Sequence, residues 1–457
     1  MKNILIAIRS IFKKGRHNVM KIVSLGIGLA VGLVLIAKVY FEQSYDDFYP
    51  DRDRVYQVWA KYQQNGGELK DYPQTSGGIA PTMQQQIPEI ETVTRYTSFG
   101  DWTFTMTDTK MKYSGRCIIA DSCFFDILPR PMLIGNAKEV LSTPMYVLIS
   151  SRIAKKTGGD FIGKNFTVDN SPGRTMTIGG VFEEVPENSH SRYDVIVSMA
   201  SAGRFMWEGS PTNMLGNDRY ISYVKLHKGV NPLALEEQVR TFVNSYFPPE
   251  EQQKVGLSID FSFHKLDNLH KELPQVKRMT WILSLLAFAL IFTAVMNYIL
   301  IVISSIVNRS KEVAVHKCYG ASENNIHGMM FGEALVHIVL SLILALLLIL
   351  AFRGTVEELL ATSLDSLLLS NGSLVLLGIC ILVFFVSGFM PGSLYARIPV
   401  ASAFRNYREN KRIWKKALLL VQFVATGFLV TMLVFVARQY TFMVNDRPGY
   451  AYENLAY

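Results

Sequence analysis

The segment Trp281–Val307 reads WILSLLAFALIFTAVMNYILIVISSIV and contains no charged residue. A helix that spans a bilayer needs about 20 consecutive apolar residues, whereas soluble helices and strands alternate apolar and polar residues at periods of 3.6 or 2. This segment therefore predicts a transmembrane helix, and it decides the class of the fold.

Four other stretches have the same character. The predicted transmembrane segments are residues 22–40, 280–307, 329–352, 372–396 and 417–438. The first follows a basic region, as a signal peptide would, but it is long and no A-x-A cleavage pattern follows it. We therefore interpret it as a retained anchor. The expected fold is an integral membrane α-helical protein of about five transmembrane helices, with a large α+β extracytoplasmic domain between the first and second.

Lys and Arg gather in three short segments. Residues 1–21 carry six, the loop 308–328 carries three and the loop 397–416 carries seven. Positive residues favour the cytoplasmic side, so we expect a cytoplasmic N-terminus and a multi-pass protein of a bacterial inner membrane. Residues 1–21 are interpreted as a cytoplasmic amphipathic helix or, alternatively, as a basic anchor without a defined helix. The net charge of +8 arises at this surface, where anionic membrane lipids attract it, so no nucleic-acid partner is expected.

Residues 41–279 are long enough to bury a core of their own. Short β-branched and aromatic runs alternate with turn residues and with two helix-like segments, so this domain is expected to be α+β, with a lobe of about 130–215 inserted into a larger one. The predicted strands are Arg54–Ala60, Trp102–Thr105, Cys117–Ala120, Pro144–Ile149, Thr175–Val181, Tyr193–Ser198 and Tyr220–Leu226, and the predicted helices are Ile79–Gln86 and Leu233–Phe247.

Several residues could carry chemistry, but each has a plainer interpretation. Cys117 and Cys123 are either a disulfide or two separate thiols. His190 is more easily a turn or packing residue than a metal ligand, because no His or Cys lies near it at ligand spacing. Glu333 and His337 are one helical turn apart in the third predicted membrane helix; interfacial solvation of Glu333 is favoured over a functional role. No nucleotide-binding motif, catalytic triad or metal cluster stands out, so the chain is not expected to be an enzyme or to hold a cofactor.

Four segments carry a resemblance to a known family. They are FEQSYDDFYPDRDRVYQV at Phe41–Val58, IGGVFEEVPENSHSRYDVIVS at Ile178–Ser198, MNYILIVISSIVNRSKEVAVHKCYGAS at Met296–Ser322, and the Pro399–Gln422 stretch. With these, the whole chain resembles MacB/FtsX-type ABC transporter permeases: a MacB-like periplasmic core domain (41–279) and an FtsX-like permease domain (280–405). It is similar to the long duplicated form common in Bacteroidetes, with residues 439–457 as the start of a second half.

The resemblance implies a mechanism. A separate cytoplasmic ABC ATPase dimer would bind and hydrolyse ATP, a coupling region in the loop 308–328 would receive its motion, and the periplasmic domain would move in response (mechanotransmission). The family pattern places the coupling role on Arg309, Lys311, Glu312, Lys317, Gly320 and Ala321. Residues Lys311 to His316 show a helical pattern, Gly320 breaks it, and Ser322 can cap the next helix.

The expected function is that of a permease subunit that exports or extrudes an envelope substrate or an antimicrobial compound. The chain would pair with a second copy of itself or with another permease half. The alternative within the family is a non-transporting FtsX-like signal transducer that regulates an envelope partner. A membrane-anchored binding protein without an ATPase is a third possibility.

Overall fold

The computed structural model describes residues 17–156, 161–169, 171–216, 218–368, 372–396, 400 and 413–445. The chain divides into two compact units, a helical unit (Met1–Phe41 with Lys277–Tyr457) and a domain (Glu42–Val276). The predicted helix at 1–21 lies outside the described residues up to residue 16, and so do most of the basic loop 397–416 and residues 446–457 of the predicted tail.

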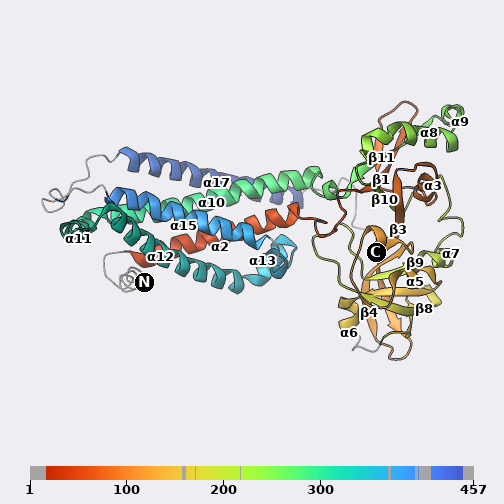
Figure 1. Cartoon of the computed structure of the whole chain (residues 1–457), viewed down its shortest axis with the longest axis horizontal. Helices are drawn as coiled ribbons and strands as arrows, with labels where there is room; N and C mark the ends of the chain where they lie inside the picture. Colours follow the sequence, from red (N-terminus) through yellow and green to blue (C-terminus); the bar gives the residue numbers. More distant parts are fainter. Residues whose placement is uncertain are drawn as a thin grey trace. The chain divides into compact units, whose positions relative to one another are not determined.

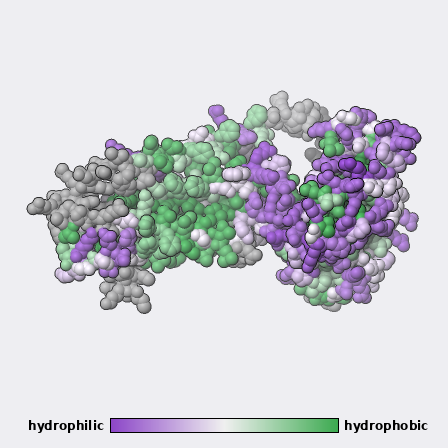
Figure 2. All heavy atoms as spheres, turned by 45° about the horizontal axis from the view of Figure 1, so that its top comes forward, coloured by the Kyte–Doolittle hydropathy of each residue, from purple (hydrophilic) through white to green (hydrophobic). Residues whose placement is uncertain are grey.

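The helical unit contains five described helices that are long and apolar enough to cross a membrane (Figure 1). On the face shown in Figure 2, hydrophobic residues cover this unit, while hydrophilic residues dominate the surface of the domain. The helices of this unit are α2 (Asn18–Gln43), α10 (Pro274–Ser304), α11 (Ile306–Cys318), α12 (Glu323–Ala351), α13 (Arg353–Leu360), α14 (Leu364–Leu368), α15 (Ser373–Ala396) and α17 (Ile413–Asn445).

The bundle is held together by small residues and aromatic contacts. A Cβ atom on Gly28 of α2 would lie only 2.2 Å from the Cβ of Ala294 on α10, so the two helices approach more closely than a larger residue would allow. Phe331 of α12 packs against Phe384 and Phe385 of α15, with ring centroids 5.5 and 6.2 Å apart. Gln422 of α17 donates a hydrogen bond to Asn297 of α10 (2.6 Å), which gives α17 a polar contact with the bundle.

The domain is built on one mixed sheet. Among the described residues, eleven strands form it, in the order β11-β1-β10-β3-β4-β9-β6-β8-β5, with β2 paired to β1 and β7 to β3 and β8. The strands are β1 (Val55–Gln64), β2 (Lys70–Tyr72), β3 (Ile90–Met106), β4 (Lys112–Ala120), β5 (Met132–Ile134), β6 (Tyr146–Ser150), β7 (Asn165–Val168), β8 (Ser171–Phe182), β9 (Val195–Ser198), β10 (Ile221–Leu226) and β11 (Leu257–Lys265).

Short helices lie between the strands in the sequence and pack against the sheet. The α-helices are α3 (Ile79–Gln86), α4 (Phe124–Ile127), α5 (Ala137–Ser142), α6 (Ser151–Lys156), α7 (Ala202–Phe205), α8 (Glu236–Tyr246) and α9 (Pro249–Val255), and the 3₁₀ turns are η1 (Met199–Ser201), η2 (Pro232–Leu235) and η3 (Leu266–Asn268).

One end of the domain has a ferredoxin-like arrangement. The order β1-α3-β3 followed by β10-α8-β11 gives two βαβ units whose four strands are antiparallel neighbours in the order β11-β1-β10-β3. Val58, Ala60, Phe242 and Phe261 belong to the apolar core of this end. Strand β11 was not predicted, although Ile259, Phe261 and Phe263 alternate with polar residues in the pattern of a strand.

The second lobe is inserted between β3 and β10, and it starts earlier than residue 130. Strand β3 bends at a register shift between Ser98 and Gly100 and continues into this lobe, where Trp102 and Phe104 join a separate apolar core. Strand β4 pairs in parallel with β9, so the inserted segment extends the same sheet. The earlier boundary arises because a single long strand serves both lobes.

The two cysteines of the domain are free thiols in the structure. Cys117 is fully buried in the core of the inserted lobe. The thiol of Cys123 donates to the carbonyl of Val93 at 3.1 Å. Of the two alternatives, a disulfide or two separate thiols, the structure has two separate thiols.

Candidate functional site

The segment that follows α10 is a helix of its own. Helix α10 ends at Ser304 and α11 begins at Ile306, with Ser305 in a turn between them. The Ser305 hydroxyl donates to the Val302 carbonyl (2.6 Å), and the Tyr395 hydroxyl of α15 donates to the same oxygen (3.1 Å). Side chains that bond to a carbonyl inside a helix interrupt its hydrogen-bond ladder, which agrees with the separation of α10 from α11 at Ser305. The predicted continuous segment 280–307 is thus interrupted at Ser305.

The C-terminal end of α11 is a glycine cap. Gly320 has φ +85°, a conformation that costs little only for glycine. Its N–H donates to the carbonyl of Lys317, and the N–H of Ala321 donates to the carbonyl of His316, both at 3.0 Å. Ser322 then accepts from the N–H of Asn325 and starts α12. The helix break predicted at Gly320 and the cap predicted at Ser322 are both confirmed.

Helix α11 has a buried face and an exposed face. Ser310, Val313 and Ala314 are buried. Lys311, Val315, His316, Cys318 and Tyr319 are exposed, and the Tyr319 side chain at the end of the helix is 89% accessible. An aromatic ring held in solvent beside a cation and an apolar side chain has the composition of a protein contact surface. We call Lys311, Val315, His316 and Tyr319 the outer face of α11.

The six predicted coupling residues differ in solvent exposure. Lys311 and Gly320 are exposed, while Glu312, Lys317 and Ala321 are half-buried. Their proposed contact with an ATPase stays a prediction. Val315 and Tyr319 were not singled out from the sequence, although they lie four residues apart, and with Lys311 they form a series at the i, i+4, i+8 spacing of one helical face.

Arg309 does not lie on the outer face. Its residue is 5% exposed, its Nη1 lies 2.8 Å from Glu333 Oε2 on α12, and its Nε lies 3.6 Å from Glu312 Oε2. Its guanidinium also packs over the ring of Tyr395, 5.5 Å from the centroid. A buried carboxylate on another helix thus holds the charge of Arg309 inside the bundle, and the coupling role of Arg309 stays a prediction.

Glu333 is not solvated at a membrane interface. It is buried, and its Oε1 lies 3.7 Å from Nζ of Lys21, a fully buried residue of α2. The interpretation of interfacial solvation was wrong because Lys21 of α2 and Arg309 of α11, on two other helices, converge on this position. Burying an ion costs several kcal/mol unless a partner compensates it, and Glu333 has two such partners.

Helix α12 carries two more buried polar groups above Glu333. His337 Nδ1 lies 3.2 Å from the hydroxyl of Tyr298 on α10. The hydroxyl of Ser341 donates to the backbone carbonyl of Ile22 on α2 at 3.1 Å. Glu333, His337 and Ser341 are spaced by four residues, so they share one face of α12, and this spacing is the signal that could have identified them together.

The domain has a second polar cluster, next to the end of α2. Glu42 Oε2 lies 2.6 Å from Nε2 of His270, and the ring of Tyr45 stacks on His270 at 3.4 Å between centroids. Burial, followed by the charge of Glu42, raises the pKa of Tyr45 to about 12. Asp46 Oδ2 lies 2.6 Å from Nδ1 of His190. His190 is thus a packing residue in a hydrogen-bonded turn, as the sequence favoured.

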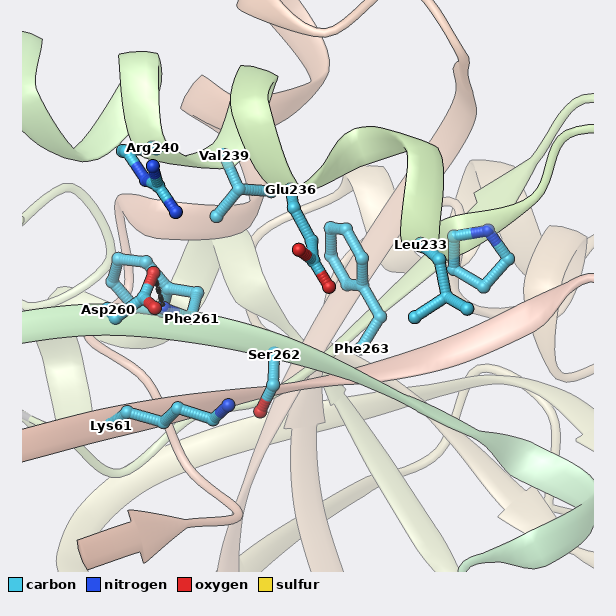
Figure 3. Close-up of a pocket in the computed structure, with 10 residues that line it drawn as sticks. Lys61, Leu233, Glu236, Val239, Arg240, Asp260, Phe261, Ser262 and Phe263 are labelled. Carbon is cyan, nitrogen blue, oxygen red and sulfur yellow. Dashed lines mark hydrogen bonds between the residues drawn. The ribbon is translucent and has the colours of Figure 1, made fainter. Parts of the chain in front are cut away.

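A groove lies along β11 at the edge of the sheet (Figure 3). Its cavity volume is about 390 Å³, and Figure 3 shows Glu236 and Arg240 of α8 extending over β11. Asp260 Oδ1 accepts the backbone N–H of Phe261, which covers one amide on this edge. The charged residues that line the groove are Lys61, Glu236, Arg240 and Asp260. Among the residues that the structure describes, no group of three or more His, Cys, Asp or Glu is placed to hold a metal ion.

Two family models match the chain in succession. The MacB-like periplasmic core domain matches residues 20–242, and the FtsX-like permease C-terminal domain matches residues 284–400. The chain belongs to the MacB/FtsX-type family of ABC transporter permeases. The MacB-like model covers most of the sheet domain. The FtsX-like model covers α12 and the whole of α11, including its outer face. The protein is therefore a multi-pass membrane protein of the permease type.

Three solved structures of single domains or regions are similar to part of this chain. A domain of a permease protein from Porphyromonas gingivalis is 33% identical, with 48% of this chain and 91% of that chain covered and a TM-score of 0.44. The periplasmic region of MacB from Actinobacillus actinomycetemcomitans is 15% identical (48% and 92% covered, TM-score 0.32). The extracellular domain of the ABC-type transporter YknZ from Gram-positive bacteria is 12% identical (45% and 98% covered, TM-score 0.32). A comparison with curated proteins gave no match.

Proposed function

We propose that this MacB/FtsX-type permease is the membrane subunit of an ABC transporter whose ATP is bound and hydrolysed by a separate ATPase dimer. The ATPase docks on the outer face of α11, and its closure moves the periplasmic-type domain, which exports or extrudes an envelope substrate or an antimicrobial compound. The subunit works in the bacterial inner membrane with its N-terminus and α11 in the cytoplasm, and it pairs with a second permease half or a second copy.

The observation that carries the proposal is the two-sided character of α11. Its inner face is fixed in the bundle by Val313 and Ala314, which are each 1% exposed, whereas Tyr319 stands in solvent at the opposite side. A short helix that is packed on one face and exposed on the other can bind a protein and be displaced by it as a rigid body. The Lys and Arg of the neighbouring segments support the cytoplasmic placement of this helix.

Capture of the ATPase from detergent extracts tests the proposal. The tagged full chain is compared with Lys311→Ala/Tyr319→Ala, which removes two exposed side chains of the outer face. The matched control is Lys254→Ala/Tyr246→Ala, which removes the same residue types from exposed positions of the domain. We expect the wild type and the control to retain an ABC ATPase and the outer-face variant to lose most of it. Equal capture by all three proteins would contradict docking on α11.

A further inference from the structure

A single buried carboxylate joins three helices of the membrane unit. Glu333 of α12 has Arg309 of α11 2.8 Å from its Oε2 and Lys21 of α2 3.7 Å from its Oε1. All three residues are more than nine-tenths buried. Each oxygen of the carboxylate therefore faces a cation on a different helix.

This arrangement resists independent movement of the helices. Charges attract much more strongly in a buried site than in water, and an ion left without its partner there is costly. If α11 shifts, Arg309 must either carry Glu333 with it or leave the buried carboxylate with Lys21 alone. The ring of Tyr395 packs against the guanidinium, so it also limits the directions in which Arg309 can move.

Helix α2 is tied to the same face of α12 at a second point. Ser341, two turns beyond Glu333, donates to the carbonyl of Ile22, the residue next to Lys21. The neighbouring residue on this face, His337, contacts Tyr298 of α10. The polar face of α12 thus meets α11 and α10 as well as α2, and α2 is the helix that continues directly into the sheet domain at Glu42.

We propose that Glu333 is a positioning residue that passes a displacement of α11 across α12 to α2. This inference rests on the proposed function, in which α11 receives the motion of the ATPase. It adds the route inside the membrane unit: Arg309 takes up the motion, Glu333 transfers it, and Lys21 delivers it to the helix that leads to the domain. Glu333 touches neither nucleotide nor substrate on this route.

An apolar variant can distinguish a role in transmission from a purely structural role of these charges. Buried ion pairs can often be replaced by apolar residues of similar volume without loss of stability, whereas removal of one member leaves an uncompensated charge. The variant Lys21→Met/Arg309→Met/Glu333→Met keeps side-chain volume on all three helices and removes the charged links. This variant therefore tests whether the protein can keep its fold and yet fail to transmit the motion of α11.

The experiment uses the full chain in nanodiscs with the ABC ATPase that it captures. Three quantities are measured for each variant: the amount of ATPase retained, the ATP hydrolysis rate, and the ATP-dependent change in hydrogen–deuterium exchange of the sheet domain. The variants are the apolar triple and Glu333→Gln. The matched control is Glu323→Gln, which removes the same group from an exposed position on the same helix.

We expect the apolar triple to retain the ATPase as the wild type does and to lose the ATP-dependent change in the domain. Glu323→Gln should behave as the wild type in all three measurements. A wild-type response from the apolar triple would overturn the inference. Loss of ATPase capture by the triple would overturn it as well, because the charges would then only shape the docking face.

A double-mutant cycle tests the link without any ATPase. The changes in thermal midpoint caused by Lys21→Met and Arg309→Met should be non-additive with Glu333 present and additive in a Glu333→Met background, because residues that share a partner are energetically coupled. Additivity in both backgrounds overturns the inference. Absence of ATPase capture by the wild type contradicts the proposed function instead, and the cycle still decides whether Glu333 connects the two helices.

Discussion

Asp46 and His190 are separated by 144 positions in the chain, yet Asp46 Oδ2 lies 2.6 Å from His190 Nδ1 in the interior of the sheet domain. Asp46 is completely buried and has φ +59°. Its other oxygen accepts the hydroxyl of Ser189 at 2.7 Å, and its backbone N–H donates to Asn188 at 2.9 Å. The chain that leaves α2 is therefore fastened to the 188–190 turn at Asp46, and Asn188 Nδ2 also donates to the carbonyl of Ser44 at 2.7 Å.

Replacement of this carboxylate should destabilise the domain. In Asp46→Asn the side chain keeps its shape and tolerates the positive φ, but one acceptor oxygen becomes an NH₂ group. A buried polar group without a suitable partner costs about 1–3 kcal/mol, so the thermal midpoint of the full chain in detergent should fall. Asp53→Asn, an exposed neighbour, is the control and should leave the midpoint unchanged. Equal midpoints for the two variants would show that the buried contact contributes nothing.

Close packing of α2 against α10 gives a second prediction. Gly28→Ala places a methyl group 2.2 Å from Ala294 Cβ, so the helices must separate. Overpacking of this kind costs about 1–3 kcal/mol, and it should lower the thermal midpoint in detergent. Gly378→Ala of α15 is the matched control, since a Cβ there meets nothing within 4 Å. The expectation fails if Gly28→Ala is as stable as the control.

The acid sensitivity of the domain should depend on Lys225. Hydrogen bonds from Lys225 and Arg54 hold the pKa of Asp51 below its usual range, and Arg54 does the same for the pKa of Glu91. The native state therefore binds protons less readily than the unfolded chain, so this stability is present above about pH 4 and is lost as the pH falls through the lower native pKa. Such partly exposed pairs contribute about 0.2–1 kcal/mol.

Lys225→Met should raise the pKa of Asp51 and make this part of the acid-induced loss smaller. The measurement is the thermal midpoint of the wild type and the variant between about pH 6 and pH 3, a range that brackets the ordinary carboxyl pKa. Lys228→Met, which removes a nearby cation that makes none of these contacts, is the control. Parallel curves for the wild type and Lys225→Met would refute the role of Lys225.

Cys318 should react with thiol reagents more readily than Cys117. Burial raises the pKa of the Cys117 thiol far above its usual range, and because the thiolate is the reactive form, Cys117 should react with maleimide only after unfolding. Cys318 is exposed at the end of α11 and should be modified in the folded protein. Mass spectrometry of peptides from native and denatured samples checks the order. A Cys117–Cys123 disulfide in the non-reduced peptide map would contradict the structure.

The sequence by itself determined the membrane segments, the α+β nature of the domain and the helix break at Gly320. These features depend on local properties: an uninterrupted apolar run has no soluble alternative, alternation marks a half-buried strand, and a glycine with Ser322 after it marks the end of one helix and the start of the next. The Met296–Ser322 segment also carried the resemblance that the two family models confirm.

Tertiary structure alone decided where the charges point. Lys21 and Arg309 counted as surface cations in the sequence, and Glu333 as an interfacial acid, yet the three meet inside the bundle. The pairing of Asp46 with His190 and the extension of one sheet through both lobes were equally out of reach. The physical reason is that a charge is buried only where a distant segment supplies its partner, and local sequence records the charge but not the partner.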